Sequence, residues 1–261
     1  MAGEGMAEQL EIDEHLVTLL APVSYEAEKY RTLAHTIELT QKDFGHHVFA
    51  VTSPTAGDGK TTTAINLAGT LAQSPEARVL LVGMDLRRPS LTEHLRMADI
   101  HAVGLASLIL DLDPARTLNQ AVQHLKKFNL SVLPAGPLLA DPYEVLKSHR
   151  LGELLQEARQ HYDYVVVDTP PVLLVPDTRL IGNWVDGFLM VVAAHKTPRR
   201  LVEEALNLMD PSKLVGLVFN SDDRQNKDYY SYYYAAGRPG THQRQSWWRR
   251  LAQTLSPRFS A

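Results

Sequence analysis

The sequence predicts an α/β fold in which helices cover both faces of a mostly parallel sheet. Short, nearly continuous apolar segments alternate with segments of helical periodicity, and strands of this kind are buried on both faces. Polar side chains directly follow several of these segments, as expected where ligands meet the carboxyl ends of parallel strands. We expect a single domain over residues 16–222, a flexible N-terminus over 1–15 and a flexible tail over 223–261.

The composition is that of an ordinary soluble protein, with 44% hydrophobic and 21% charged residues among 261. The formal net charge of −4 gives no general indication of nucleic-acid binding, and we expect no such partner. Cysteine is absent, which excludes disulfides, a thiolate nucleophile and a cysteine-based zinc site. No apolar run reaches the roughly 18 residues of a membrane-spanning helix, and the acidic N-terminus lacks a signal-peptide pattern. We therefore expect a cytoplasmic protein.

The first predicted helix begins after Ser24, a residue type that often accepts hydrogen bonds from the free N–H groups at a helix start. Four residues then recur at helical spacing: Ala27, Tyr30, Ala34 and Ile37. Residues 1–14 are small and acidic, so we expect no fixed structure there.

A phosphate-binding loop is predicted within Val51–Asn66. An apolar run at 47–51 indicates a buried strand, and a regularly spaced apolar stripe predicts a helix after the loop: Ala64, Leu67, Ala68 and Leu71. Strand, glycine-containing turn, Lys-Thr and helix follow in the order that a phosphate-binding loop requires. The alternative is a glycine turn that precedes a helix by chance.

The residue types in this loop suit a nucleotide and a metal ion. Gly57 and Gly59 let the backbone curl and turn its N–H groups inward. Lys60 is expected to reach the β- and γ-phosphates, and the Thr61 hydroxyl to bind Mg²⁺. Pro54 stands where the usual motif has its first glycine. We predict ATP and Mg²⁺ as ligands, with ATP held by Ala56, Gly57, Asp58, Gly59, Lys60, Thr61, Thr62 and, at the adenine, Asn220.

The remaining elements follow from the same periodicities. Strands are expected at 78–82, 130–133, 164–168, 187–192 and 214–220. Helices are expected at 143–148, 150–161 and 198–209, and the stretch 90–128 is expected to be mainly helical, with a loop at 111–114.

Three polar residues follow apolar strands and are candidates for chemistry. Asp168 has no packing reason to end its strand, and we predict that it contacts Mg²⁺ directly or through water; the alternative is that it caps the next turn. Asp85 is expected to hold Mg²⁺ or to accept the proton of an attacking hydroxyl, or else to form a surface ion pair with a neighbouring arginine. Asn220 either presents its amide to adenine or is a satisfied turn residue.

The C-terminal segment has a different composition. It contains a cluster of five tyrosines within six positions, Tyr229, Tyr230, Tyr232, Tyr233 and Tyr234. They could form a core stripe, stack on nucleic acid or sugar, or be phosphorylated by a neighbouring kinase site. The tail after them carries five arginines and no acidic residue, so it could be a solvated linker or contact an anionic surface through the stretch 247–250.

Together these features resemble the bacterial tyrosine autokinases, or BY-kinases, that regulate capsule and exopolysaccharide production, in their separate cytoplasmic form. The resemblance covers roughly residues 16–235. It rests on the phosphate loop at Ser53–Thr62, which in that family also lacks the first glycine, on the strand end at Val79–Pro89, on the strand at Tyr164–Pro171, and on the tyrosine cluster. The family is related to the MinD- and ParA-like ATPases, which implies a P-loop NTPase-like fold.

The resemblance implies roles for further residues and also shows two departures. The strand end is similar to the family's motif D-x-D-x-R, in which Asp85 and Arg87 match but the first aspartate is Gly83. The resemblance therefore implies Lys60, Asp85, Arg87 and Asp168 as the catalytic group and Thr61, Asp85 and Asp168 as metal ligands. The family's motif E-x-x-R-x-x-R, used in ring assembly, is matched by Glu28 and Arg31 but not by Ala34.

The resemblance implies an autokinase that phosphorylates the tyrosine cluster between subunits. Its implied partners are a second copy of the chain, a separate membrane protein of the polysaccharide co-polymerase type, and a tyrosine phosphatase as antagonist; its implied location is the inner face of the cell membrane, reached through that partner. Because of Gly83, an ATP-binding regulatory pseudokinase is the alternative. A partitioning ATPase is disfavoured, since Thr55 occupies the position of that group's signature lysine.

Overall fold

The computed structural model describes residues 12–97, 103–110 and 117–222. The tyrosine cluster, the arginine-rich tail and the predicted loop at 111–114 lie outside the described residues. Among the described residues, seven strands form one sheet in the order β3-β4-β2-β5-β1-β6-β7. All neighbouring strands are parallel except β3, which runs antiparallel to β4, so the predicted fold class is confirmed. The strands are β1 Val48–Thr52, β2 Val79–Gly83, β3 Gln123–Leu125, β4 Leu130–Leu133, β5 Tyr164–Asp168, β6 Gly187–Ala193 and β7 Leu214–Asn220.

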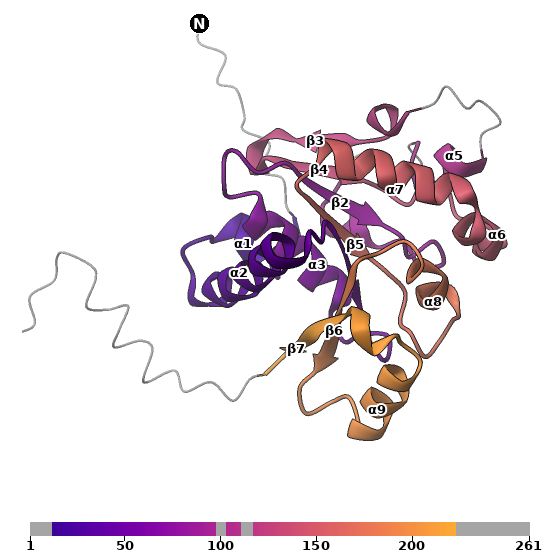
Figure 1. Cartoon of the computed structure of the whole chain (residues 1–261). Coiled ribbons are helices and arrows are strands. Elements are labelled where there is room, and N and C mark those ends of the chain that lie inside the picture. The colour runs from indigo at the N-terminus through magenta and orange to yellow at the C-terminus, as the bar shows by residue number, and fades with distance from the viewer. Residues whose placement is uncertain (1–11, 98–102, 111–116, 223–261) are drawn as a thin grey trace, which may run out of the picture. The chain divides into compact units, whose positions relative to one another are not determined.

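Helices cover both faces of this sheet (Figure 1). They are α1 Val17–Leu20, α2 Tyr25–Phe44, α3 Lys60–Leu71, α4 Leu91–His94, α5 Leu105–Leu110, α6 Pro142–Lys147, α7 His149–His161, α8 Asp177–Ile181 and α9 Arg199–Asn207. Short 3₁₀ turns lie at Leu118–Gln120, Lys126–Phe128 and Pro211–Lys213. In Figure 1, α1, α2 and α3 lie on one side of the sheet, and α6, α7 and α8 lie on the other.

The alternation of strand side chains divides the interior into two main cores. In β1, Val48 and Ala50 join the core under α5 to α8, whereas Phe49 and Val51 join the core under α2, α3 and α4. The predicted apolar stripe of α3 is buried, as is most of the predicted stripe of α2. Burial on both faces explains why the central strands are uniformly apolar.

The N-terminal boundary is fixed by local contacts. Ser24 caps α2 as predicted, because its hydroxyl accepts the N–H of Ala27 at 3.1 Å. Contacts are also seen for residues that precede this helix, within the segment 1–15 that we expected to be flexible. Ile12 is buried, and the Asp13 carboxylate lies 2.6 Å from Nδ1 of His94 in α4. The boundary at residue 16 stays a prediction.

The prediction for 90–128 was wrong in part. Its described residues contain two short helices, but also β3, which forms a hairpin with β4 through the left-handed Asn129 (φ 51°). β3 was not predicted because Gln123 and His124 are polar, as suits an edge strand that is partly exposed. The short helices α1 and α8 were also not predicted.

The sheet order decides where chemistry can occur. In the centre of the sheet β5 lies between β1 and β2, and Asp168 pairs in register with Val51 on one side and with Gly83 on the other. The residues that follow these three strands therefore meet at one edge.

Candidate active site

The loop between β1 and α3 has the backbone geometry of an anion cradle. Gly57 and Gly59 are both left-handed, with φ of 85° and 90°. A Cβ atom at Gly59 would lie 2.0 Å from Nδ2 of Asn220, and the left-handed backbone would strain any other residue there. Within the described part of the chain, no side chain caps the N-terminus of α3, so the N–H groups at its start face the loop without a competing side-chain acceptor.

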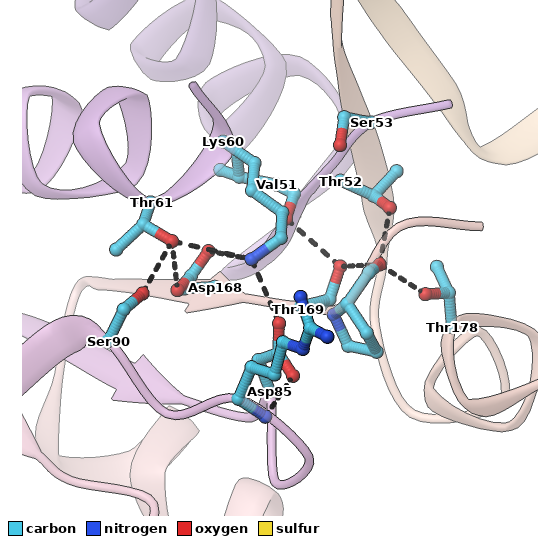
Figure 2. Close-up of polar contacts among 12 residues, drawn as sticks. Val51, Thr52, Ser53, Lys60, Thr61, Asp85, Ser90, Asp168, Thr169 and Thr178 are labelled. Atoms are coloured by element: carbon cyan, nitrogen blue, oxygen red, sulfur yellow. Dashed lines mark hydrogen bonds and ion pairs between the residues drawn. The ribbon is translucent and has the colours of Figure 1, made fainter. Parts of the chain in front are cut away.

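Lys60 lies between two buried carboxylates (Figure 2). Its Nζ is 3.0 Å from Oδ2 of Asp85 and 3.7 Å from Oδ1 of Asp168. The three side chains are only 13%, 7% and 1% exposed, respectively. Asp85 therefore does not form the surface pair with a neighbouring arginine that the sequence left open as its alternative.

Thr61 connects the Lys60–Asp85–Asp168 group to Ser90, a residue that the sequence did not suggest. The Thr61 hydroxyl donates to Oδ2 of Asp168 at 2.8 Å and lies 3.2 Å from the hydroxyl of Ser90 (Figure 2). Because the Thr61 hydrogen is committed to Asp168, Ser90 donates to Thr61. Ser90 follows a proline and belongs to no motif used above, so no sequence signal singled it out.

Burial and pairing shift the ionisation of the two central groups. Burial raises the pKa of Asp168 to about 6, against the attraction of Lys60 and the hydrogen bond from Thr61. Burial also acts to lower the pKa of Lys60, but the attraction of Asp168 and then of Asp85 outweighs it, and the Lys60 pKa is raised. Lys60 therefore stays a cation at neutral pH.

The donor atoms here suit Mg²⁺. Oδ1 of Asp168 is buried and accepts no hydrogen bond from the residues that the structure describes, and the Thr61 oxygen lies beside the same carboxylate. Hard oxygen donors of this kind are the ligands that Mg²⁺ prefers. No group of three or more acidic, histidine or cysteine side chains that could hold a metal occurs among the described residues. An ion held here would therefore need phosphate oxygens or water to complete its shell.

Two cavities meet at this site. One, of about 630 Å³, is lined by the phosphate loop, by Arg88 and His94, and by Pro170 and Pro171. The other, of about 590 Å³, lies over Gly83 and is walled by Leu91, Met97 and Leu138. Asp85, Arg87 and Ser90 line both cavities, so the two spaces adjoin at these three side chains.

Arg87 is held by a partner that the sequence did not reveal. Its guanidinium donates two hydrogen bonds, at 2.7 and 3.0 Å, to the fully buried carboxylate of Asp177 at the start of α8. This bidentate pair fixes the direction of the Arg87 side chain. The two partners are ninety positions apart in the sequence, which explains why no motif contained both.

The other predicted residues lie in different surroundings. Asn220 donates its amide to the backbone carbonyl of Asp58 in the loop, at 3.0 Å. Glu28 and Arg31 pair with each other on the surface of α2, and Arg31 also donates to the carbonyl of Pro22 at 2.7 Å. Ala34 is buried, at 4% exposure, so an arginine at this position would have to leave the core.

Comparison with known proteins gives the family. Residues 46–182 match the AAA domain model. The chain is 35% identical over 224 residues to the tyrosine-protein kinase YwqD of Bacillus subtilis, an alignment that covers 85% of this chain and 92% of that protein. The chain belongs to the bacterial tyrosine-protein kinases.

Further relatives agree with this assignment. The tyrosine-protein kinase Etk of Escherichia coli is 28% identical over 81% of this chain, which spans only 28% of that longer protein. The solved kinase domain of Etk has a TM-score of 0.76 at 26% identity, with 86% of each chain covered. A ParA family ATPase from Chlorobium tepidum shares the fold, with a TM-score of 0.56 at 25% identity over 74% of this chain and 82% of that one. The predicted P-loop NTPase-like fold is thereby confirmed.

Proposed function

We propose that the chain is an ATP-dependent protein-tyrosine autokinase that phosphorylates the tyrosines of its own C-terminal cluster between subunits. The observation that carries this proposal is the arrangement of Lys60 between Asp85 and Asp168, with Thr61 bonded to Asp168, in a member of the bacterial tyrosine-protein kinases. The arrangement combines an anion cradle, a cation and oxygen donors for a metal, which phosphoryl transfer requires.

Each residue has a distinct task in this proposal. Lys60 moves from the two carboxylates to the β- and γ-phosphates of ATP, because the phosphates offer it a higher negative charge. Thr61 and Asp168 would hold Mg²⁺, which when bound would neutralise charge on the phosphates. Asp85, released from Lys60, accepts the proton of the attacking tyrosine hydroxyl as the tyrosine oxygen bonds to the γ-phosphorus and ADP leaves. Arg87, fixed by Asp177, presents positive charge to both cavities.

The acceptors proposed are Tyr229, Tyr230, Tyr232, Tyr233 and Tyr234. Each phosphate would add about −1.5 to −2 charges, so five phosphates would change the tail from basic to strongly acidic. We propose that this charge regulates assembly with a separate membrane protein of the polysaccharide co-polymerase type, and hence capsule or exopolysaccharide polymerisation and export. A tyrosine phosphatase would remove these phosphates and so reverse the change in charge.

The proposed location is the cytoplasmic face of the membrane, reached through the partner. No helix among the described residues is long and apolar enough to cross a membrane. Glu28 and Arg31 are proposed as contacts between copies of the chain in a homo-oligomer such as a ring.

The proposal is tested by incubating the full chain with Mg-ATP and the cytoplasmic segment of its membrane partner, followed by mass spectrometry for phosphotyrosine. We expect phosphate on the tyrosine cluster, and none in Lys60→Met at equal protein and nucleotide concentration. ATP binding without phosphate on these tyrosines would overturn the autokinase proposal.

Gly83 favours a second candidate, an ATP-binding regulatory pseudokinase of the same system. Position 83 pairs in register with Asp168, and it lacks the carboxylate that the resembled motif has there. This candidate predicts nucleotide-dependent binding of the membrane partner in the absence of any phosphotyrosine.

A further inference from the structure

Asp58 is a buried carboxylate inside a loop shaped for anions. It is only 3% exposed, and both of its oxygens accept hydrogen bonds. Oδ2 accepts the Thr55 N–H at 2.9 Å and the Thr55 hydroxyl at 3.1 Å, and Oδ1 accepts the Thr197 hydroxyl at 2.6 Å. A negative charge so close to a phosphate site opposes phosphate binding, so its presence calls for a compensating role.

The contacts of Asp58 join the phosphate loop to two other segments. Thr55 belongs to the loop itself, so its bonds close the loop into a turn. Thr197 lies between β6 and α9, 139 residues away in sequence. The Asp58 carbonyl accepts the amide of Asn220, the last residue of β7. One residue of the loop is therefore bonded to both segments.

These two segments are also bonded to each other. The N–H of Ala194 donates to the carbonyl of Asn220 at 2.7 Å, and Nε2 of His195 lies 3.3 Å from Oδ1 of Asp222. His195 and Ser221 both have left-handed backbones, with φ of 62° and 57°. Non-glycine residues adopt this conformation at a cost, so the connection is held by its surroundings. Asn220 precedes Tyr229 by nine residues.

We propose that Asp58 is a positioning residue that holds the phosphate loop in shape and links it to Thr197 and Asn220, so that nucleotide binding stabilises the end of β7, which precedes the tyrosine cluster in the sequence. This inference rests on the proposed nucleotide site. Asp58 touches neither phosphate nor acceptor in this role. It acts through the loop N–H groups, which it keeps turned inward, and through the bonds it shares with the end of β7.

The test measures binding of Mg-ADP to the full chain by calorimetry. Asp58→Ala removes the acceptor of three hydrogen bonds, and we expect about tenfold weaker binding. Asp58→Asn keeps an acceptor for Thr55 and offers its amide to the Thr197 hydroxyl, which can turn to accept it, so binding should stay within about threefold of wild type. If Asp58 had no positioning role, removing its charge would strengthen binding; equal or tighter binding by Asp58→Ala would overturn the inference.

The link from the phosphate loop to Thr197 and the end of β7 is tested by hydrogen exchange. In the wild type, Mg-ADP should slow exchange both in residues 53–60 and in residues 194–197 and 214–222. In Thr197→Val, protection of 53–60 should persist while that of 194–197 is reduced about tenfold, because the direct link to this segment is cut and only the link through Asn220 remains. The matched control is Thr36→Val, which removes an exposed hydroxyl. Among the described residues, this hydroxyl bonds only to the Thr32 carbonyl.

Two outcomes contradict the link. Protection confined to residues 53–60 in the wild type would show that the phosphate loop and the end of β7 are independent. Equal protection of all segments in Thr197→Val would show that Thr197 does not carry the connection. Both experiments measure nucleotide binding rather than phosphotyrosine, so a missing kinase activity leaves them valid. Absence of any Mg-ADP binding by the wild type would instead defeat the proposed function, and this inference with it.

Discussion

Lys60 is the residue whose surroundings explain most about the site. One cation is shared by two buried carboxylates, which leaves the metal-free site with an excess of one negative charge at neutral pH. A buried charge that lacks full compensation is costly. The site is therefore arranged to gain positive charge from a metal ion and to exchange its internal ion pairs for contacts with phosphate.

Asp168 makes this expectation measurable through pH. Because a metal ion needs the deprotonated carboxylate and the pKa of Asp168 is raised to about 6, affinity for Mg-ADP should fall as pH decreases through about 6. The stability of the metal-free fold should change in the opposite direction, decreasing as pH rises. The Asp168 pKa is higher folded than unfolded, so its contribution to stability is complete below pH 3.8 and is lost as pH rises through about 6.

Calorimetry and chemical denaturation between about pH 5 and pH 8 check both trends. Asp168→Asn is the control, since an amide does not titrate. A pH profile of Mg-ADP binding that is the same in Asp168→Asn and in the wild type would contradict this account of the carboxylate.

Gly83→Asp tests whether the missing carboxylate limits the reaction. The new side chain would adjoin Asp168, in a position where a Cβ atom lies 3.2 Å from the Ala135 nitrogen, so a small local shift is needed. We expect the initial rate of phosphotyrosine formation to rise about 100-fold, the low end for a general base. The metal-free fold should lose about 1 kcal/mol through repulsion among three carboxylates.

Gly83→Ala separates the steric effect from the charge, because it adds the Cβ atom alone. Equal rates for the wild type, Gly83→Ala and Gly83→Asp would mean that Asp85 suffices as the base and that Gly83 imposes no limit.

The sequence predicted the parts of the site that lie close together in the chain. Gly57, Gly59, Lys60 and Thr61 follow one strand, and their order alone indicates a phosphate loop. The contacts of Ser90 with Thr61 and of Arg87 with Asp177 depend on how separate elements pack. Such contacts have no local pattern. Asn220 was predicted near the loop, yet its hydrogen bond to Asp58 could only be seen in the structure.

At the scale of elements, uniform burial made the central strands predictable, whereas partial exposure and short length hid others. β5 and β7 were predicted with the bounds that the structure has, since their apolar runs end abruptly. β3 has three residues with mixed polarity, and α8 has five, which is too short for a helical period to repeat. Both are fixed by tertiary contacts that the sequence does not display.

Gly152 in α7 gives a stability prediction for such a contact. A Cβ atom there would lie 2.3 Å from the ring of Trp184, which packs against the helix. Glycine to alanine inside a helix normally gains about 1 kcal/mol, but overpacking costs about 1–3 kcal/mol. We expect Gly152→Ala to lower the free energy of unfolding by up to about 2 kcal/mol, measured in urea.

The matched control is Gly216→Ala in β7, where a Cβ atom would meet nothing within 4 Å. It should leave the free energy of unfolding unchanged or raise it by less than about 1 kcal/mol. Two variants of equal stability would show that Trp184 moves aside without cost.

At the scale of the whole molecule, assembly is the property that the proposed function requires. Arg31 lies on α2 and is about two-fifths exposed, and its ion pair with Glu28 is worth less than about 1 kcal/mol to the single chain. Arg31→Ala should therefore shift the chain toward smaller species in light scattering with Mg-ATP, with little change in melting temperature.

Arg199→Ala is the control for assembly, because Arg199 is also exposed and pairs along its own helix with Glu203. Arg199→Ala should keep the wild-type mass. A wild-type monomer, or equal masses for all three proteins, would contradict the role given to Arg31.

The central claim is that one subunit transfers phosphate to the tyrosines of another. It is tested most directly by mixing two full-length chains with Mg-ATP: an isotopically heavy Lys60→Met chain and a light chain whose five cluster tyrosines are phenylalanine. Mass spectrometry then assigns each phosphate to its chain. We predict phosphotyrosine on Tyr229–Tyr234 of the heavy chain, which cannot phosphorylate itself. No phosphotyrosine on the heavy chain, while the light chain binds Mg-ATP, would contradict the account.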